Sequence, residues 1–144
     1  MEQQEILTLL QQVAEGSVTP QQAELQLKMA PFEDLGFAKL DHHRALRQGV
    51  AEVIYGAGKT PEQIRAIAQA MLARGQRTVL ITRMSAEAAA AMEGLPFRYD
   101  PLSRVGIAGT LPEPDGHGTI LIATGGTSDQ PVAEEAALTA EALG

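Results

Sequence analysis

The sequence of 144 residues contains no cysteine and no tryptophan, and only 3% of its residues are aromatic. The absence of cysteine excludes disulfides, thiolate metal sites and cysteine nucleophiles within these residues. With so few aromatic rings, Ala, Leu, Ile and Val must fill the core. Since Ala has a small side chain, it allows the backbones of helices and strands to approach closely, as dense interiors require. These features indicate a helix-on-sheet core and exclude a disulfide-stabilised fold.

A basic excess is also absent, because 18 acidic residues outnumber 11 Lys and Arg and give a formal net charge of −7. This disfavours a general nucleic-acid-binding protein, although local cations can still face a small anionic ligand. No apolar run approaches the roughly 20 residues that a membrane-spanning helix needs. The start of the chain, Met1–Glu5, is acidic and polar, unlike a signal peptide. We therefore expect a cytoplasmic protein that binds neither nucleic acid nor membranes.

Hydrophobic periodicity predicts strands that alternate with helices. The clearest helix is predicted over residues 60–74, where Thr60 and Gln63 form a capping-box signature. Residues 78–82 and 119–123 are continuous apolar runs, which are typical of interior parallel strands. Shorter elements are predicted as helices over 6–13, 20–30, 85–92 and 130–143, and as strands over 37–40, 53–55, 97–99 and 104–108.

These elements predict an α/β fold, since alternating strands and helices form βαβ units with a parallel sheet. Residues 1–31 are expected to form a helical hairpin, and residues 32–110 an α/β domain. The turn-rich segment 111–118 is predicted to be a linker. Residues 119–144 would be the first βα unit of a further domain. Because this unit ends on a helix with no strand after it, we expect the natural chain to continue.

The strongest candidate site is the loop that follows the apolar run 119–123. It consists of Thr124, Gly125, Gly126, Thr127, Ser128 and Asp129. Loops at the carboxyl ends of parallel strands bind ligands in open α/β sheets. Here glycines allow close approach, and the N–H groups of the next helix attract phosphate or carboxylate. We predict a substrate-binding loop; the alternative is that Ser128 or Asp129 only caps the helix.

Three cations before residue 60 could face the same ligand. Arg44 and Arg47 are spaced to hold a phosphate or carboxylate between them, although a solvated charge cluster is the alternative. Lys59 follows two glycines, but a P-loop is excluded because Val53 stands where its first glycine is required. His42 and His43 have no third ligand at a suitable spacing, so no metal site is predicted.

Two motifs together resemble LarB proteins, the enzymes of nickel-pincer cofactor biosynthesis. The first runs through Asp41–Gly49 and Glu52–Thr60, and resembles the N-terminal LarB signature. The second, Ala123–Ala136, resembles the opening of the carboxylase-like domain of the same proteins. That domain is similar to PurE, carboxyaminoimidazole ribonucleotide mutase. The resemblance therefore implies that a PurE-like domain of flavodoxin-like, three-layer type begins at residue 119.

The resemblance also implies an activity. LarB-type enzymes carboxylate the pyridinium ring of nicotinic acid adenine dinucleotide with carbon dioxide or bicarbonate. They also hydrolyse the phosphoanhydride, which releases AMP and pyridinium-3,5-biscarboxylic acid mononucleotide. No permanently bound cofactor is implied, and a requirement for Mg²⁺ stays open. Homo-oligomers are implied as well, because the mutase relatives assemble into closed rings.

The chain departs from the family in one respect, because the family uses a cysteine thiolate and this chain has no cysteine. The catalytic residues of the family are therefore expected beyond Gly144, and these residues alone are expected to be inactive. Two alternatives stay open. One is a purine-pathway mutase, which lacks the more than 100 residues that precede Thr124 here. The other is a non-catalytic nucleotide-binding or assembly module.

Overall fold

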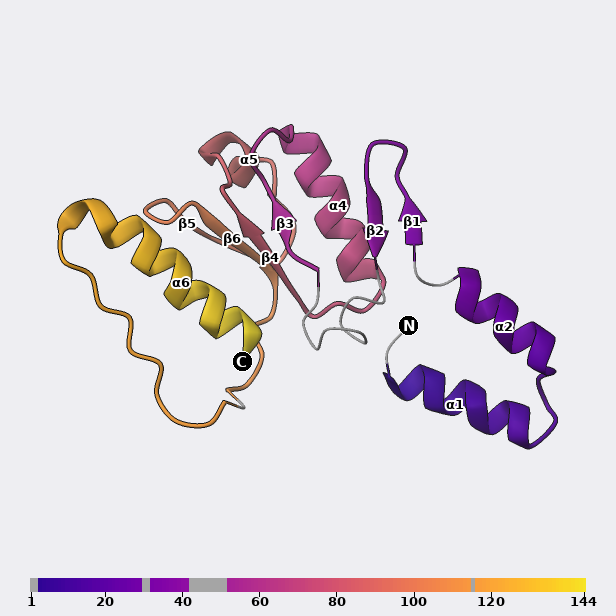
Figure 1. The fold of residues 1–144 in the computed structure, drawn as a ribbon. Helices are drawn as coiled ribbons and strands as arrows, with labels where there is room; N and C mark the ends of the chain where they lie inside the picture. The colour runs from indigo at the N-terminus through magenta and orange to yellow at the C-terminus, as the bar shows by residue number, and fades with distance from the viewer. Residues whose placement is uncertain (1–2, 30–31, 42–51, 115) are drawn as a thin grey trace. The chain divides into compact units, whose positions relative to one another are not determined.

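The computed structural model describes residues 3–29, 32–41, 52–114 and 116–144, and it divides the chain into two compact units (Figure 1). These units are Met1–Glu52 and Val53–Gly144. The predicted residues Arg44, Arg47, His42 and His43 lie outside the described residues.

The first unit begins with the predicted helical hairpin, formed by α1 (Gln3–Ala14) and α2 (Pro20–Met29). Thr19 starts α2 as predicted, because its hydroxyl accepts from Gln22 N at 3.2 Å while the Gln22 side chain accepts from Thr19 N at 2.9 Å. Only 4% of Leu9 and 6% of Ala23 are exposed. The hairpin is therefore confirmed as a packed unit.

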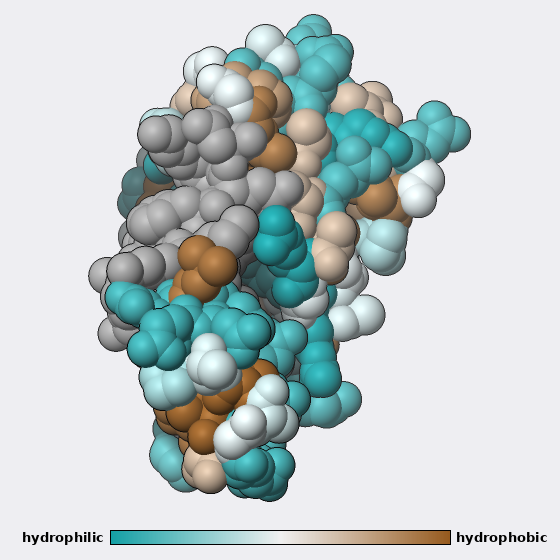
Figure 2. Space-filling view, turned by 90° about the vertical axis from the view of Figure 1, so that its right-hand side faces the viewer, coloured by the Kyte–Doolittle hydropathy of each residue, from teal (hydrophilic) through white to brown (hydrophobic). Residues whose placement is uncertain are grey.

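Exposed apolar side chains and a short strand pair complete the first unit. The exposed side chains include Leu7, Leu10 and Leu25, and brown patches among teal ones are visible low in Figure 2.

The strands are β1 (Phe32–Asp34) and β2 (Lys39–Asp41), which pair antiparallel. The strand predicted over 37–40 thus lies slightly later, and its partner β1 was not predicted, because a three-residue strand is stable only through its neighbour.

The second unit contains a four-stranded sheet in the order β3-β4-β6-β5. Its elements, in chain order, are β3 (Ile54–Tyr55), α4 (Pro61–Ala73), β4 (Thr78–Thr82), α5 (Ala86–Ala90), β5 (Phe97–Asp100), β6 (Val105–Gly109), the 3-10 helix η1 (Thr127–Asp129) and α6 (Gln130–Leu143). The α/β class is confirmed, and α4 begins where the capping box predicts, with Thr60 Oγ1 accepting from Gln63 N at 3.3 Å.

The sheet is mixed, whereas the sequence predicted a parallel one. β3 and β4 are parallel and joined through α4, which confirms one βαβ unit. β6, however, pairs antiparallel with both β4 and β5. A turn of four residues, 101–104, joins β5 to β6, and so short a connection permits only an antiparallel pair. β4 is an interior strand, as predicted.

Helices cover both faces of this sheet. On one face, Leu80, Val105 and Ile107 form a buried cluster with α6 through Leu138 and Ala142. Side chains alternate along a strand, so Val79 and Ile81 point to the opposite face. That face is covered by α4, whose buried residues are Ile64, Ile67, Ala68 and Met71. The result is a three-layer arrangement with β4 buried between α4 and α6.

The strand predicted over 119–123 is not formed. These residues have no strand or helix assignment, and Ile120 and Leu121 are 75% and 87% exposed. An apolar, β-branched run favours an extended backbone, but a strand also needs a neighbour that completes its hydrogen bonds. No described strand lies beside this run. The prediction was therefore wrong for this structure.

None of the helices in the described part of the chain is long and apolar enough to cross a membrane.

Candidate functional site

The carboxyl ends of β3 and β4 meet at one edge of the sheet, and a tight turn joins β3 to α4 there. Gly56 N donates to Thr82 O at 2.7 Å. A side chain at Gly56 would meet the backbone, since an added Cβ would lie 2.9 Å from Thr82 O and 3.2 Å from Arg83 O. Only glycine therefore permits this close approach, which holds the turn against the end of β4.

Lys59 lies at the end of this turn, directly before the N-cap Thr60. Its backbone N–H donates to Gly56 O at 3.1 Å, and the residue is half-buried. Among the described residues, its ammonium group forms no hydrogen bond or ion pair. The predicted lysine thus ends the turn that follows β3, without a partner for its charge in the described part of the chain, and the P-loop remains excluded because Thr60 caps α4.

Two arginines that the sequence analysis did not select lie at the same edge. Arg83 follows β4 and Arg104 precedes β6, with φ angles of 54° and 60°. In the described part of the chain they are the only non-glycine residues with positive φ. Such a conformation costs about 1 kcal/mol for a residue with a Cβ. Arg83 could have been predicted as a site residue from its place directly after an apolar strand. Nothing in the sequence indicates its positive φ angle.

Several hydrogen bonds hold the backbone next to these two arginines. Met84 N donates to Arg104 O at 2.8 Å. The Met84 carbonyl accepts from Arg104 Nε at 3.3 Å and from Tyr99 Oη at 3.1 Å. Met84 itself is fully buried, and the next residue, Ser85, caps α5 by accepting from Ala88 N at 3.1 Å. The backbone positions of both arginines are therefore fixed.

A carboxylate supports the turn that leads to Arg104. Asp100 Oδ2 accepts from Ser103 N at 2.7 Å and from Ser103 Oγ at 2.5 Å. These hydrogen bonds from Ser103 hold the pKa of Asp100 below its ordinary value. Asp100 forms no ion pair with Arg104 among the described residues.

The predicted loop Thr124–Asp129 is exposed throughout. Thr124 Oγ1 donates to Gly126 O at 3.1 Å, and the last three residues form η1. Asp129 occupies the N-cap position of α6, but its side chain makes no capping hydrogen bond. The capping alternative thus receives no support for Asp129. The first N–H group of α6, at Gln130, donates to Thr127 O, and the next residue, Pro131, has no N–H.

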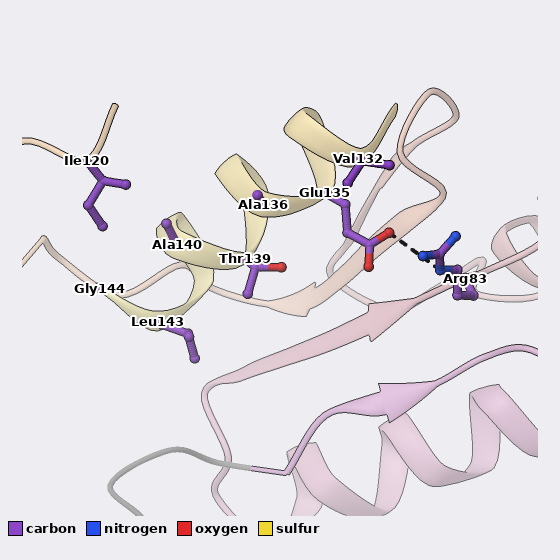
Figure 3. A pocket seen from close by; sticks show the side chains of 9 residues that line it. All are labelled: Arg83, Ile120, Val132, Glu135, Ala136, Thr139, Ala140, Leu143 and Gly144. Atoms are coloured by element: carbon purple, nitrogen blue, oxygen red, sulfur yellow. Dashed lines mark ion pairs between the residues drawn. The ribbon is translucent and has the colours of Figure 1, made fainter. Parts of the chain in front are cut away.

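An ion pair joins α6 to the edge of the sheet at which Lys59, Arg83 and Arg104 lie, called the cationic edge below. Arg83 Nε lies 3.6 Å from Glu135 Oε2, and Figure 3 shows the two side chains facing each other. Beside them lies a groove of about 590 Å³, lined mainly by apolar side chains of α6 and by Ile120. Glu135 is five residues past the start of α6, a helical rise of about 8 Å. The Thr124–Asp129 loop therefore leads into α6 near Arg83.

The structure thus brings Lys59, Arg83 and Arg104 to the ends of three adjacent strands, β3, β4 and β6. The predicted loop is linked to the same edge through Glu135. The role of Lys59 and of the loop in binding stays a prediction, as does that of Arg44 and Arg47. In the described residues no three His, Cys, Asp or Glu side chains lie together as a metal site would require.

The fold and this edge define an α/β protein with cationic side chains where the carboxyl ends of the parallel strands β3 and β4 meet the amino end of the antiparallel strand β6. Residues 32–109, more than half of the chain, match the family described as the LarB/PurE-like N-terminal domain. The chain therefore belongs to this family, which confirms the resemblance to LarB proteins and indicates an enzyme family of carboxylase or mutase type. No curated protein matches the sequence. The division of residues 32–144 into two domains and a linker stays a prediction.

Proposed function

We propose that this chain is the nucleotide-binding part of a LarB-type enzyme of nickel-pincer cofactor biosynthesis. The substrate would be nicotinic acid adenine dinucleotide. The reaction would add a second carboxylate to its pyridinium ring, from carbon dioxide or bicarbonate, and hydrolyse its phosphoanhydride to release AMP. The observation that carries this proposal is the family match over residues 32–109, which includes the whole cationic edge.

The charges at the edge support a substrate of this kind. A dinucleotide of nicotinic acid carries a pyrophosphate and a carboxylate, and such groups bind to cations and to free N–H groups. Lys59 supplies an ammonium group without a described partner, and the exposed Thr124–Asp129 loop supplies hydroxyl groups. In this proposal Lys59 holds a phosphate oxygen while the loop receives a second anionic group.

These residues are assigned binding and positioning rather than bond making. Carboxylation of an electron-poor ring needs electron density from a nucleophile, and the family's thiolate has no counterpart in a chain without cysteine. The described residues also present no carboxylate cluster for Mg²⁺, so no step is assigned to a metal. We therefore expect the 144 residues alone to incorporate no labelled bicarbonate into the dinucleotide; labelled product would contradict this assignment.

Calorimetric titration of the chain with nicotinic acid adenine dinucleotide, NAD and AMP tests the binding proposal. The carboxylate-bearing dinucleotide should bind more tightly than NAD. Lys59→Ala should weaken its binding roughly ten- to a hundredfold, the worth of a charged hydrogen bond. Arg98→Ala is the matched control, because Arg98 is exposed and pairs with Glu141 at 3.2 Å. Equal affinity for all three nucleotides, or equal effects of both variants, would reject the proposal.

We also propose a homo-oligomer. Ile120 and Leu121 are 75% and 87% exposed, and exposed apolar runs of this kind are typical of surfaces that another chain covers. Light scattering that gives a monomer mass of 15.3 kDa at micromolar concentration would contradict this part of the proposal.

A further inference from the structure

Arg83 and Arg104 occupy facing positions at the end of two antiparallel strands. The register of β4 and β6 pairs Leu80 with Ile107 and Ile81 with Gly106. Continued by two residues, the same register sets Arg83 opposite Arg104. The hydrogen bond from Met84 N to Arg104 O, at 2.8 Å, confirms that the two segments remain adjacent beyond the sheet. Both side chains therefore start from neighbouring backbone positions.

The backbone conformation does not favour arginine at either position. Both residues have positive φ, a conformation in which glycine or asparagine is favoured over a longer side chain. Like charges that face each other across two strands also repel. Two adjacent strand ends thus combine two unfavourable features, and neither feature contributes to the packing of the sheet. Residues that fold poorly at their own positions are often retained for what they bind.

The positive charge is only partly compensated within the second unit. Arg83 has Glu135 at 3.6 Å, but half of the Arg83 side chain is exposed, so the pair is screened by water. Arg104 uses its Nε for the Met84 carbonyl, which leaves its two terminal NH₂ groups available. Among the described residues it forms no ion pair. The nearest carboxylate in sequence, Asp100, already accepts two hydrogen bonds from Ser103.

We propose that Arg83 and Arg104 bind one oxyanion of a small molecule, either a carboxylate or a phosphate group. The planar, forked guanidinium group matches the oxygens of both anions. The buried Met84 and the Tyr99 hydroxyl hold the backbone between the arginines, so the site is largely formed before the anion arrives. Binding of the anion would replace Glu135 as the partner of Arg83. This site rests on the geometry of the edge and does not depend on the reaction proposed above.

The test measures binding of simple anions at constant ionic strength to the full 144-residue chain. Inorganic phosphate, AMP and nicotinate are titrated separately and followed by NMR shifts of the arginine side-chain NH groups. Binding of phosphate and AMP assigns a phosphate site, whereas binding of nicotinate alone assigns a carboxylate site. Wild-type protein that binds none of the three would overturn the proposal, even if it binds nicotinic acid adenine dinucleotide elsewhere.

Arg83→Gly and Arg104→Gly are the decisive variants. Glycine adopts positive φ without strain, so each variant loses the guanidinium group while the backbone is relieved. We expect each to lower anion affinity at least tenfold with little change in melting temperature, because relief of the positive φ offsets the lost hydrogen bond from Arg104 to Met84 O or the lost ion pair of Arg83 with Glu135. The double variant should lose less than the product of the single effects, because one anion is shared. Arg98→Ala, the surface control, should keep wild-type affinity.

Two further variants exclude simpler explanations. Glu135→Gln should raise the affinity severalfold, since it removes the carboxylate that competes for Arg83. Arg83→Lys and Arg104→Lys keep the positive charge and a Cβ at a residue with positive φ, but they lose the planar, forked guanidinium group. These variants should bind the anion more weakly than wild type. They also serve as folded test proteins if a glycine variant does not fold. Affinity that depends only on net charge, with the glycine variants and Arg98→Ala equally weak and the lysine variants equal to wild type, would reduce the site to a solvated cationic surface.

Discussion

The contact between Gly56 and the end of β4 gives the sharpest test of how this edge is built. Replacing Gly56 by Ala places a Cβ 2.9 Å from Thr82 O and 3.2 Å from Arg83 O. Both atoms belong to the backbone of a central strand, so neither can rotate away as a side chain would. The strand pair must separate, which also lengthens the 2.7 Å hydrogen bond from Gly56 N to Thr82 O.

The expected loss of stability is the sum of these two effects. Overpacking at a rigid contact costs about 1–3 kcal/mol, and a weakened hydrogen bond adds about 0.5–1.5 kcal/mol. We therefore expect Gly56→Ala to lower the free energy of unfolding by about 2–4 kcal/mol. With a urea dependence of about 1–3 kcal/mol per molar, the unfolding midpoint should fall by about 0.7–4 M.

Tyrosine fluorescence is the suitable assay, because the chain has two tyrosines and no tryptophan. Both Tyr55 and Tyr99 belong to the second unit, so the signal reports on this unit alone. Gly58→Ala is the matched control in the same turn. Gly58 has φ +79° and open space around it, so its variant should lose only about 1 kcal/mol of backbone energy. Equal losses for the two variants would show that the close approach at Gly56 is not what stabilises the edge.

Two other predictions concern the supports of the site. Hydrogen bonds from Ser103 lower the pKa of Asp100 from its ordinary 3.8, so this group stabilises the fold above about pH 4 and the contribution disappears as the pH falls through the lowered value. Asp100→Asn should therefore destabilise the protein near neutral pH, and urea midpoints should show the difference from wild type shrinking as the pH falls below about 4; a constant difference would contradict the linkage. Leu138→Ala should lower the free energy of unfolding by about 2–4 kcal/mol, because the Leu138 side chain packs on Leu80 and Ile107 from α6; an unchanged midpoint would mean that α6 contributes little to the stability of the sheet.

Local signals in the sequence predicted the elements that are stabilised locally. The capping box of Thr60 and Gln63 located the start of α4, and the apolar run over 78–82 located β4. Both depend on contacts within a few residues, or on burial that a run of Val, Leu and Ile requires on either face of a sheet. The same reasoning located the hairpin of α1 and α2.

The failures concern pairing, which depends on residues far apart in the chain. The run over 119–123 has the composition of a strand but has no described neighbour, whereas the less apolar β6 is an interior strand because β4 and β5 flank it. The direction of β6 follows from the short turn 101–104, and the sequence analysis expected the parallel direction from the general alternation of strands and helices. Composition predicts extended backbone, but only the complete set of neighbours decides which run joins the sheet.

The candidate site shows the same division between local and distant information. Lys59 was predicted from a glycine-containing turn, and that turn does lie at a carboxyl edge. Arg83 and Arg104 are separated by 21 positions and become neighbours only because β6 returns beside β4. Because the two arginines are neighbours at this edge, the same contacts support the positive φ angle of both. Met84 and Tyr99 hold the backbone in a conformation that the arginines alone would not adopt. If these arginines are retained for binding, replacing both by glycine should abolish anion affinity and change the stability little, because relief of the positive φ offsets the two side-chain contacts that are lost. A fold that needed the arginines for its own stability would lose both together.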